Sequence, residues 1–168
     1  GATSGIGKAT AQLLAAKGFR LILCGRRSEV LEQIKTELST NTEIYTLNFD
    51  QRHLHDVENA FASLPDSWKN IDVLVNNAGN AHGLDPLSDG NTKDWDAMID
   101  GNVKGLLYVS KCVIPGMKER KSGHIVNISS VAARQTYVNG VVYCASKKAV
   151  DVISDGMRLE LTEFGIKV

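Results

Sequence analysis

Two residues in the last quarter of the chain could carry out proton transfer. Tyr143 and Lys147 stand four positions apart in the segment Tyr-Cys-Ala-Ser-Lys, inside a pattern that predicts a helix. This spacing puts both side chains on one helical face, a turn apart. A free tyrosine has a pKa of about 10 and a nearby ammonium lowers it, so the pair could act as a general acid and base. A single pair of this spacing is, however, more often a routine surface contact.

Hydroxyl and amide side chains follow two short apolar segments. Ser129 and Ser130 come after residues 124–128, and Asn-Asn-Ala-Gly at residues 76–79 comes after residues 73–75. Sites in doubly wound α/β folds form at the carboxyl ends of strands. A hydroxyl there can hydrogen-bond a substrate carbonyl or alkoxide. Both segments also fit ordinary turns, in which serine, asparagine and glycine are common.

The first seven residues form a glycine-rich turn ahead of a helical segment. Glycines allow a tight turn and close approach by a pyrophosphate, whose charge is attracted by free N–H groups at a helix start. The spacing G-x-x-x-G-x-G differs from the commonest dinucleotide fingerprint. It is also no phosphate loop of the nucleotide triphosphatases, because Ala2 and Ala9 stand where that loop needs glycine and a hydroxyl. A plain turn with a helix start is the alternative.

The end of the second apolar segment bears on the kind of nucleotide. It reads Cys24-Gly25-Arg26-Arg27, with no acid. An acid at this place bonds the ribose 2′-hydroxyl of NAD, whereas arginine suits the 2′-phosphate of NADP through two forked hydrogen bonds. The arginines therefore favour NADP, and a solvated charge pair is the alternative.

These residues lie on alternating strand-like and helix-like segments. The strand-like segments are short, continuous and apolar, which is typical of a parallel sheet covered by helices on both faces. We therefore predict one domain over residues 1–168 with an α/β fold, a doubly wound, Rossmann-like three-layer sandwich. Strands are predicted at residues 21–24, 43–47, 71–75 and 124–128, and helices at 9–17, 28–38, 54–64, 92–99, 102–119 and 141–164.

Composition excludes several classes of function. Lysine plus arginine equals aspartate plus glutamate at 19 each, so there is no electrostatic case for nucleic acid or an anionic membrane. No apolar run approaches the roughly 20 residues of a membrane span, and no leader pattern is present, so we expect a cytoplasmic location. Three scattered cysteines and four scattered histidines lack metal-ligand spacing, and we expect no metal.

Together and in this order, the motifs resemble the short-chain dehydrogenase/reductase family. The resemblance covers essentially all 168 residues. It includes the glycine turn, the Asn-Asn-Ala-Gly segment, Trp95 followed by Asn-Val-Lys-Gly, Ile-Val-Asn-Ile-Ser-Ser, and Tyr-Cys-Ala-Ser-Lys. Ser130 precedes Tyr143 by thirteen residues, as is usual in the family. The resemblance implies an oxidoreductase in which a nicotinamide cofactor exchanges hydride with a hydroxyl or carbonyl substrate.

The resemblance also implies roles for four residues. Tyr143 would exchange a proton with the substrate oxygen, and Ser130 would hold and polarise that oxygen. Lys147 would lower the tyrosine pKa and bond the nicotinamide ribose. Asn102, which alone would fit an ordinary helix N-cap, would fix a water that links Lys147 to solvent. Asp50 would lie beside the adenine. The full set implied for NADP is Gly1, Thr3, Ser4, Gly5, Ile6, Gly7, Arg26, Arg27, Asp50, Asn77, Ala78, Gly79, Tyr143 and Lys147.

Some segments are closer in look to one subgroup. Residues 63–72, 94–100 and 113–117 are similar to NADP-dependent 3-hydroxy acid dehydrogenases, which oxidise serine or allo-threonine and reduce semialdehydes. The alternatives are another carbonyl reductase of the family, acting on a 3-oxoacyl group or a sugar or polyol, and a catalytically silent nucleotide-binding module.

The family pattern leads to two further expectations. The first strand and the last strands of the fold are expected to be missing from this segment, which would leave their neighbours unpaired and the domain truncated at both ends. The apolar helical segments 106–117 and 150–164 are expected to pair with a second copy, giving a homodimer or homotetramer.

Overall fold

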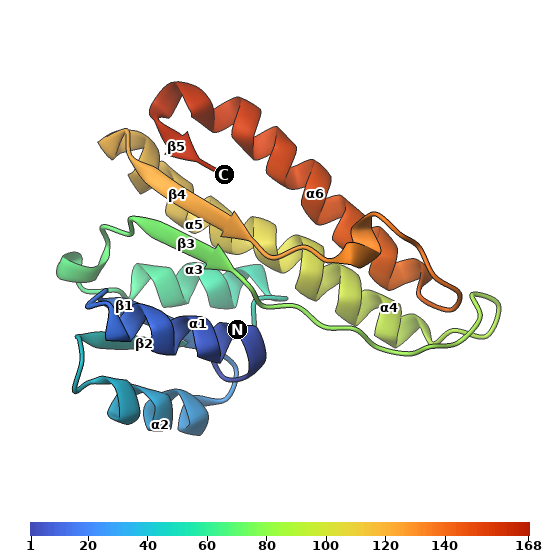
Figure 1. Ribbon diagram of the computed structural model, residues 1–168, viewed down its shortest axis with the longest axis horizontal. Coiled ribbons are helices and arrows are strands. Elements are labelled where there is room, and N and C mark those ends of the chain that lie inside the picture. The colour runs from blue at the N-terminus through green and yellow to red at the C-terminus, as the bar shows by residue number, and fades with distance from the viewer.

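Parallel strands and helices alternate along residues 1–168, all of which are described by the computed structural model (Figure 1). The predicted order of strands and helices is confirmed, with most bounds shifted by a few residues. The helices are α1 (Gly5–Ala16), α2 (Ser28–Leu38), α3 (Leu54–Ala62), α4 (Thr92–Ile99), α5 (Gly105–Arg120) and α6 (Val141–Leu161). The strands are β1 (Leu21–Gly25), β2 (Ile44–Asn48), β3 (Val73–Asn76), β4 (Gly123–Asn127) and β5 (Ile166–Lys167).

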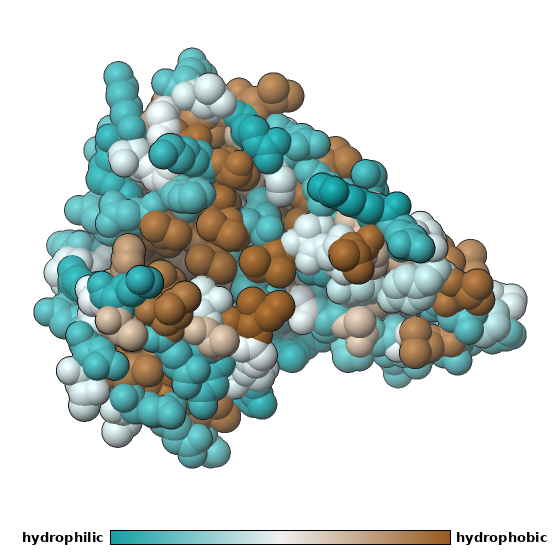
Figure 2. All heavy atoms as spheres, viewed as in Figure 1, coloured by the Kyte–Doolittle hydropathy of each residue, from teal (hydrophilic) through white to brown (hydrophobic).

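The strands form two separate parallel sheets. β1 pairs with β2, and β3, β4 and β5 form the second sheet in that order. β1 and β3 are not hydrogen-bonded to each other, which agrees with the expectation that the neighbours of a missing strand stay unpaired. A slot of about 480 Å³ lies between them, and 18 of its 29 lining residues are hydrophobic. Figure 2 shows apolar side chains gathered along this slot.

The fold has two apolar cores of different size. The smaller has eight buried residues, among them Leu23 and Leu31, and joins β1 and β2 to α1 and α2. The larger has fourteen, among them Leu47 of β2, Val57 and Ile125, and joins β2 and β3 to β5 with α3, α5 and α6. Leu31, Ile34 and Leu38 recur at helical spacing and are all buried, so α2 forms because it has one apolar face to cover.

The long helix predicted at residues 102–119 differs from the structure at its start. Asp100–Lys104 forms a π-helical turn, in which Gly105 N–H donates to the Asp100 carbonyl five residues back, and α5 begins only after it. π turns of this kind are often found at functional sites. At the other end of the chain, Gly165 takes a left-handed conformation with φ 67° and ends the helical path ahead of β5. No helix has both the length and the apolar character needed to cross a membrane.

Candidate active site

The glycine turn packs against the segment that follows β3. A Cβ on Gly1 would lie 2.7 Å from Asn77 Nδ2, and a Cβ on Gly7 would collide with the Gly1 carbonyl. Asn77 Nδ2 also donates to the Gly1 carbonyl at 3.1 Å. Glycine is therefore required at both positions for this close approach. The structure thus brings together two of the sequence-predicted cofactor segments.

The start of α1 is open to a negatively charged ligand. The N–H groups of Gly5, Ile6 and Gly7 donate no hydrogen bond within the chain, and Ser4 provides no side-chain cap. Gly5 has φ 53°, and nothing lies within 4 Å of the position of a Cβ there. Free N–H groups at a helix start attract phosphate. This arrangement fits the pyrophosphate of a dinucleotide.

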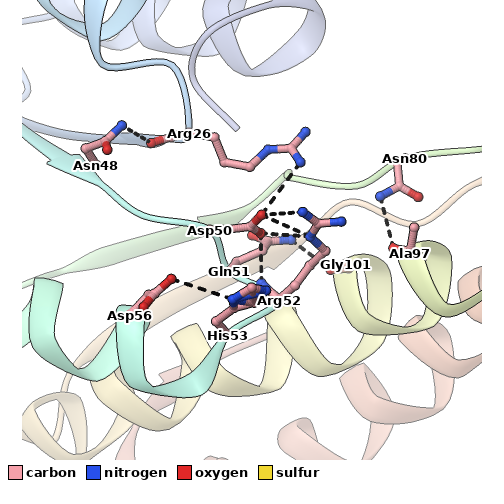
Figure 3. Close-up of polar contacts among 11 residues, drawn as sticks. Arg26, Asn48, Asp50, Gln51, Arg52, His53, Asp56, Asn80, Ala97 and Gly101 are labelled. Carbon is pink, nitrogen blue, oxygen red and sulfur yellow. Dashed lines mark hydrogen bonds and ion pairs between the residues drawn. The ribbon is translucent and has the colours of Figure 1, made fainter. Parts of the chain in front are cut away.

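Three arginines lie close to the ends of β1 and β2, and Figure 3 shows two of them, Arg26 and Arg52, directed at Asp50. Arg26 forms an ion pair with Asp50 at 3.7 Å, and its guanidinium is largely exposed. Arg27 instead donates to Thr3 Oγ1 at 2.7 Å and so braces the glycine turn. Arg52 bonds both oxygens of Asp50, the shortest at 2.6 Å. Arg26 is the arginine that is free to reach a 2′-phosphate, while Arg52 holds the Asp50 carboxylate.

Asp50 is held in its charged form. Its partial burial would raise the pKa of its carboxyl, but hydrogen bonds from Arg52 and the charge of Arg26 outweigh that effect and lower the pKa overall. The carboxylate therefore stays an acceptor at neutral pH. An acceptor at this place is compatible with the position beside the adenine that the family resemblance implied for Asp50.

Asn102 lies in the π turn and clamps the chain that follows β3. Its Nδ2 donates to the Asn80 carbonyl at 2.8 Å, and its Oδ1 accepts from the Asn80 N–H at 2.7 Å. The same Nδ2 donates to Ser146 Oγ at 3.0 Å, on α6. A Cβ on Gly79 would lie 3.0 Å from Asn102 Oδ1 and 3.4 Å from Lys147 Nζ. Asn102, Gly79 and Lys147 therefore meet at one place, as the sequence analysis expected.

Lys147 points its ammonium toward the carboxyl end of β4. Its Nζ donates to the Ile128 carbonyl at 2.9 Å, and Ser129 Oγ donates to the Lys147 carbonyl at 3.3 Å. Burial lowers the pKa of the Lys147 ammonium from its ordinary value. The Lys147 ammonium is therefore buried one helical turn from Tyr143.

Tyr143 and Ser130 are less tightly fixed than Asn102 and Lys147. Tyr143 lines a cavity of about 390 Å³, together with residues of the 81–98 and 137–142 segments, and its hydroxyl makes no hydrogen bond within the chain. Ser130 Oγ accepts from the Ala132 N–H at 3.2 Å. The structure records no direct contact between Ser130 and Tyr143. Both hydroxyls can therefore still donate to a ligand.

Sequence reasoning did not single out four residues that organise the site. Ser146 could have been found, because it stands inside the Tyr-Cys-Ala-Ser-Lys segment and immediately precedes Lys147. Arg52 stands two positions after Asp50, and an arginine so near an acid was a usable signal. The roles of Asn80 and Gln51 depend on partners 22 and 50 residues away, and no local pattern indicates them.

Comparisons with known proteins agree with the geometry. The short chain dehydrogenase family profile matches residues 1–168. The NADP-dependent 3-hydroxy acid dehydrogenase YdfG of Salmonella typhi is 44% identical over all 168 residues, and the serine 3-dehydrogenase of Rhizobium radiobacter is 42% identical. The chain covers 67% of the first relative and 66% of the second, so it spans about two thirds of their length.

A solved structure shows the same arrangement of the backbone. The closed form of serine dehydrogenase complexed with NADP⁺ superposes with a TM-score of 0.94 at 43% identity, over 100% of this chain and 67% of that one. At 43% identity the likeness includes the sequence as well as the fold.

Proposed function

The chain belongs to the short-chain dehydrogenase family, and from this premise we propose that it interconverts a hydroxyl and a carbonyl group by hydride transfer with NADP, with Tyr143 as the general acid and base. The observation that carries the proposal is the buried ammonium of Lys147, one helical turn from a tyrosine that lines a cavity. Burial keeps a cation close to the point where negative charge develops during proton transfer.

The choice of NADP is supported by the cofactor end of the site. The free N–H groups at the start of α1 suit the pyrophosphate, and Arg26 at the end of β1 suits a 2′-phosphate. Asp50 would accept from the adenine, and residues 77–79 would lie along the adenosine ribose. When bound, NADP supplies or accepts the hydride. The two relatives and the solved structure carry dehydrogenase names, two of them with NADP.

The proton chemistry falls to four side chains of the chain itself. Tyr143 would give its proton to a carbonyl oxygen, or take one from a hydroxyl, at the edge of the cavity. Ser130 would hold that oxygen by a hydrogen bond from its hydroxyl, which donates to no group within the chain. Lys147 would stabilise the tyrosine oxygen and bond the nicotinamide ribose. Asn102, clamped by Asn80 and Ser146, would hold the water that reaches Lys147.

The cavity beside Tyr143 suits a small polar substrate. Its charged lining groups are the carboxylates of Asp85 and Asp94, and the remaining lining is mostly apolar or amide-bearing. These carboxylates would accept from the ammonium group of serine or allo-threonine, and the 3-hydroxy acid and serine dehydrogenase names of the two relatives support the same substrate class. We therefore propose a small 3-hydroxy acid, or the corresponding semialdehyde, as substrate. The first alternative is a 3-oxoacyl or polyol substrate. The second is a nucleotide-binding module that has no catalytic activity.

The test is steady-state turnover by the intact protein with serine, allo-threonine, other 3-hydroxy acids, simple secondary alcohols and a polyol, with NADP and with NAD. We expect reduction of NADP with the 3-hydroxy acids and much slower reduction of NAD. Preference for the polyol would move the substrate to another subgroup of the family. Tight NADPH binding without turnover on any substrate would favour the silent module.

A further inference from the structure

We propose that Gln51 is a positioning residue that couples the adenosine end of the cofactor site to the catalytic π turn; this rests on the proposed NADP-dependent function. Gln51 directly follows Asp50, beyond the end of β2. Asn102 lies in the π turn Asp100–Lys104, which precedes α5 in the part of the molecule that contains β3 to β5. Gln51 Nε2 donates to the Gly101 carbonyl at 2.7 Å, across 50 residues of sequence (Figure 3).

The same amide nitrogen also reaches the segment after β3. Gln51 Nε2 donates to the Ala78 carbonyl at 3.2 Å. A carboxamide nitrogen has two hydrogens, so the donors of this side chain are fully committed to Gly101 and Ala78. Ala78 belongs to the segment proposed to lie along the adenosine ribose, and Gly101 immediately precedes Asn102. One side chain therefore fixes a cofactor-binding strand end and a catalytic turn relative to each other.

Space has been left for this side chain. A Cβ on Gly105 would lie 2.6 Å from Gln51 Cγ and 2.9 Å from Nε2, so only glycine at the start of α5 admits the amide. Gln51 also makes the only side-chain hydrogen bond between residues 1–52 and residues 95–168. The Asn80 backbone also bonds Asn102 directly, so Gln51 is a second connection to the π turn, and it is the one that starts beside Asp50.

The path from Gln51 to the proposed proton chemistry is short. Asn102 passes the constraint to the Asn80 backbone and to Ser146 Oγ on α6. Ser146 is the neighbour of Lys147. A ligand that orders residues 77–79 would therefore also order the π turn through Gln51, and hold Asn102 where the mechanism needs it. Without the amide, the cofactor could still bind, but only the bonds between Asn80 and Asn102 would connect its binding to the π turn, and the ordering of that turn would be weaker.

The deciding variant is Gln51→Met, which keeps an unbranched side chain of similar length and removes the amide. Gln33→Met is the matched control, since Gln33 is exposed on α2 and makes no side-chain hydrogen bond. We expect kcat of the Gln51 variant to fall about tenfold, with KM for NADP changed less than threefold, because two carbonyls lose their donor while the cofactor contacts stay. The control should match the unaltered enzyme in both constants.

Hydrogen exchange gives a readout that does not depend on turnover. In the unaltered protein, NADPH should slow amide exchange at residues 77–80 and at 100–104 together, whereas in Gln51→Met the slowing at 77–80 should remain and that at 100–104 should be at least halved. Equal NADPH protection of 100–104 in both proteins would overturn the proposal, as would a kcat within twofold of the unaltered enzyme. If the unaltered protein binds NADPH but turns over no substrate, the proposed function fails, and the exchange result alone decides on Gln51.

Discussion

The cofactor end of the site and its catalytic end hold their polar groups in opposite ways. Arg26 at the end of β1 has a side chain that is 64% exposed, and its ion pair is long. At the catalytic end, Asn102 is 2% exposed, Ser146 0% and Lys147 6%. Exposed groups can move to meet a charged ligand, while buried groups keep one geometry before the ligand arrives. The comparison indicates that Arg26 can adapt to a charged ligand, while the buried groups around Asn102 and Lys147 keep one geometry.

The two ends also stand on different elements. Asn102 lies in the π turn and Tyr143 and Lys147 lie on α6, whereas Arg26 follows β1 and Arg52 follows β2. Variants at the two ends should therefore separate cleanly: those at the catalytic end should change kcat or stability, and those at the cofactor end should change KM for NADP.

The largest effect is expected from Tyr143→Phe. Loss of the hydroxyl removes the proposed acid and base, and kcat should fall about a thousandfold. NADPH affinity, measured by fluorescence titration, should stay within a factor of three, since the ring remains on α6. Tyr45→Phe, on β2 against Trp68, is the control and should leave both quantities unchanged. Residual turnover above a tenth would show that Tyr143 is not the acid and base.

Asn102→Ala should come next, with effects on both activity and stability. The substitution leaves the half-buried Asn80 N–H and carbonyl without partners, and the buried Ser146 hydroxyl keeps only its bond to the Tyr143 carbonyl. We expect a loss of about 3 kcal/mol in the free energy of unfolding by urea, and kcat about a hundredfold lower. Asn59→Ala on the exposed face of α3 serves as control. A stable variant with low kcat would mean that the clamp matters for the reaction alone.

Arg26→Ala should have a smaller effect, confined to the cofactor end. We expect KM for NADP to rise about twentyfold, as for loss of a charge-assisted bond to phosphate, and KM for NAD to stay the same. The melting temperature should not change, because Arg52 still holds Asp50. Lys35→Ala removes another exposed charge, on α2, and should affect neither constant. An equal rise in KM for NAD and for NADP would contradict the assignment of Arg26 to the 2′-phosphate.

The smallest effect is the pH dependence of stability in Lys147→Met. Burial lowers the pKa of Lys147 in the folded protein below that in the unfolded chain. The folded state is therefore penalised while both states are protonated, and the penalty disappears as pH rises from the folded pKa to the unfolded one. At pH 7 the variant should be more stable by up to about 1 kcal/mol, reduced by loss of the Ile128 bond.

The difference in the free energy of unfolding between Lys147→Met and the unaltered protein, measured with urea, should become smaller at alkaline pH. A difference that is the same at pH 7 and at alkaline pH would show that Lys147 carries no desolvation cost. The Lys147→Met variant should have no activity at either pH.

Features of the fold that depend on neighbouring residues could be predicted from the sequence, whereas features that depend on contacts between distant residues could not. The segments that became β1, α2 and α4 were placed from apolar spacing and turn residues, because these depend on neighbours within one or two turns. The π turn at Asp100–Lys104 was read as plain helix, since a fifth-residue hydrogen bond has no composition of its own. Gly5–Lys8 was read as turn but is the first turn of α1.

The candidate site shows the same division. Tyr143, Lys147 and Asn102 were found from motifs of a few residues, and the structure places Lys147 and Asn102 around Gly79. The contacts of Gln51 could not be found, because they depend on how β2, β3 and α5 pack in space. The catalytic assignment of Asn102, Ser130, Tyr143 and Lys147 stays a prediction, to be decided by turnover.

The slot between β1 and β3 has a consequence for how the chain behaves among copies of itself. Strands that flank an empty place present unpaired N–H and carbonyl groups, which are templates for edge-to-edge association. The residues that line this slot are mainly apolar, and the chain carries a formal net charge of zero. Little electrostatic repulsion therefore opposes contact at neutral pH. An extended apolar segment that occupied the slot would pair these strand edges, and it would thereby reduce the tendency of this segment to aggregate.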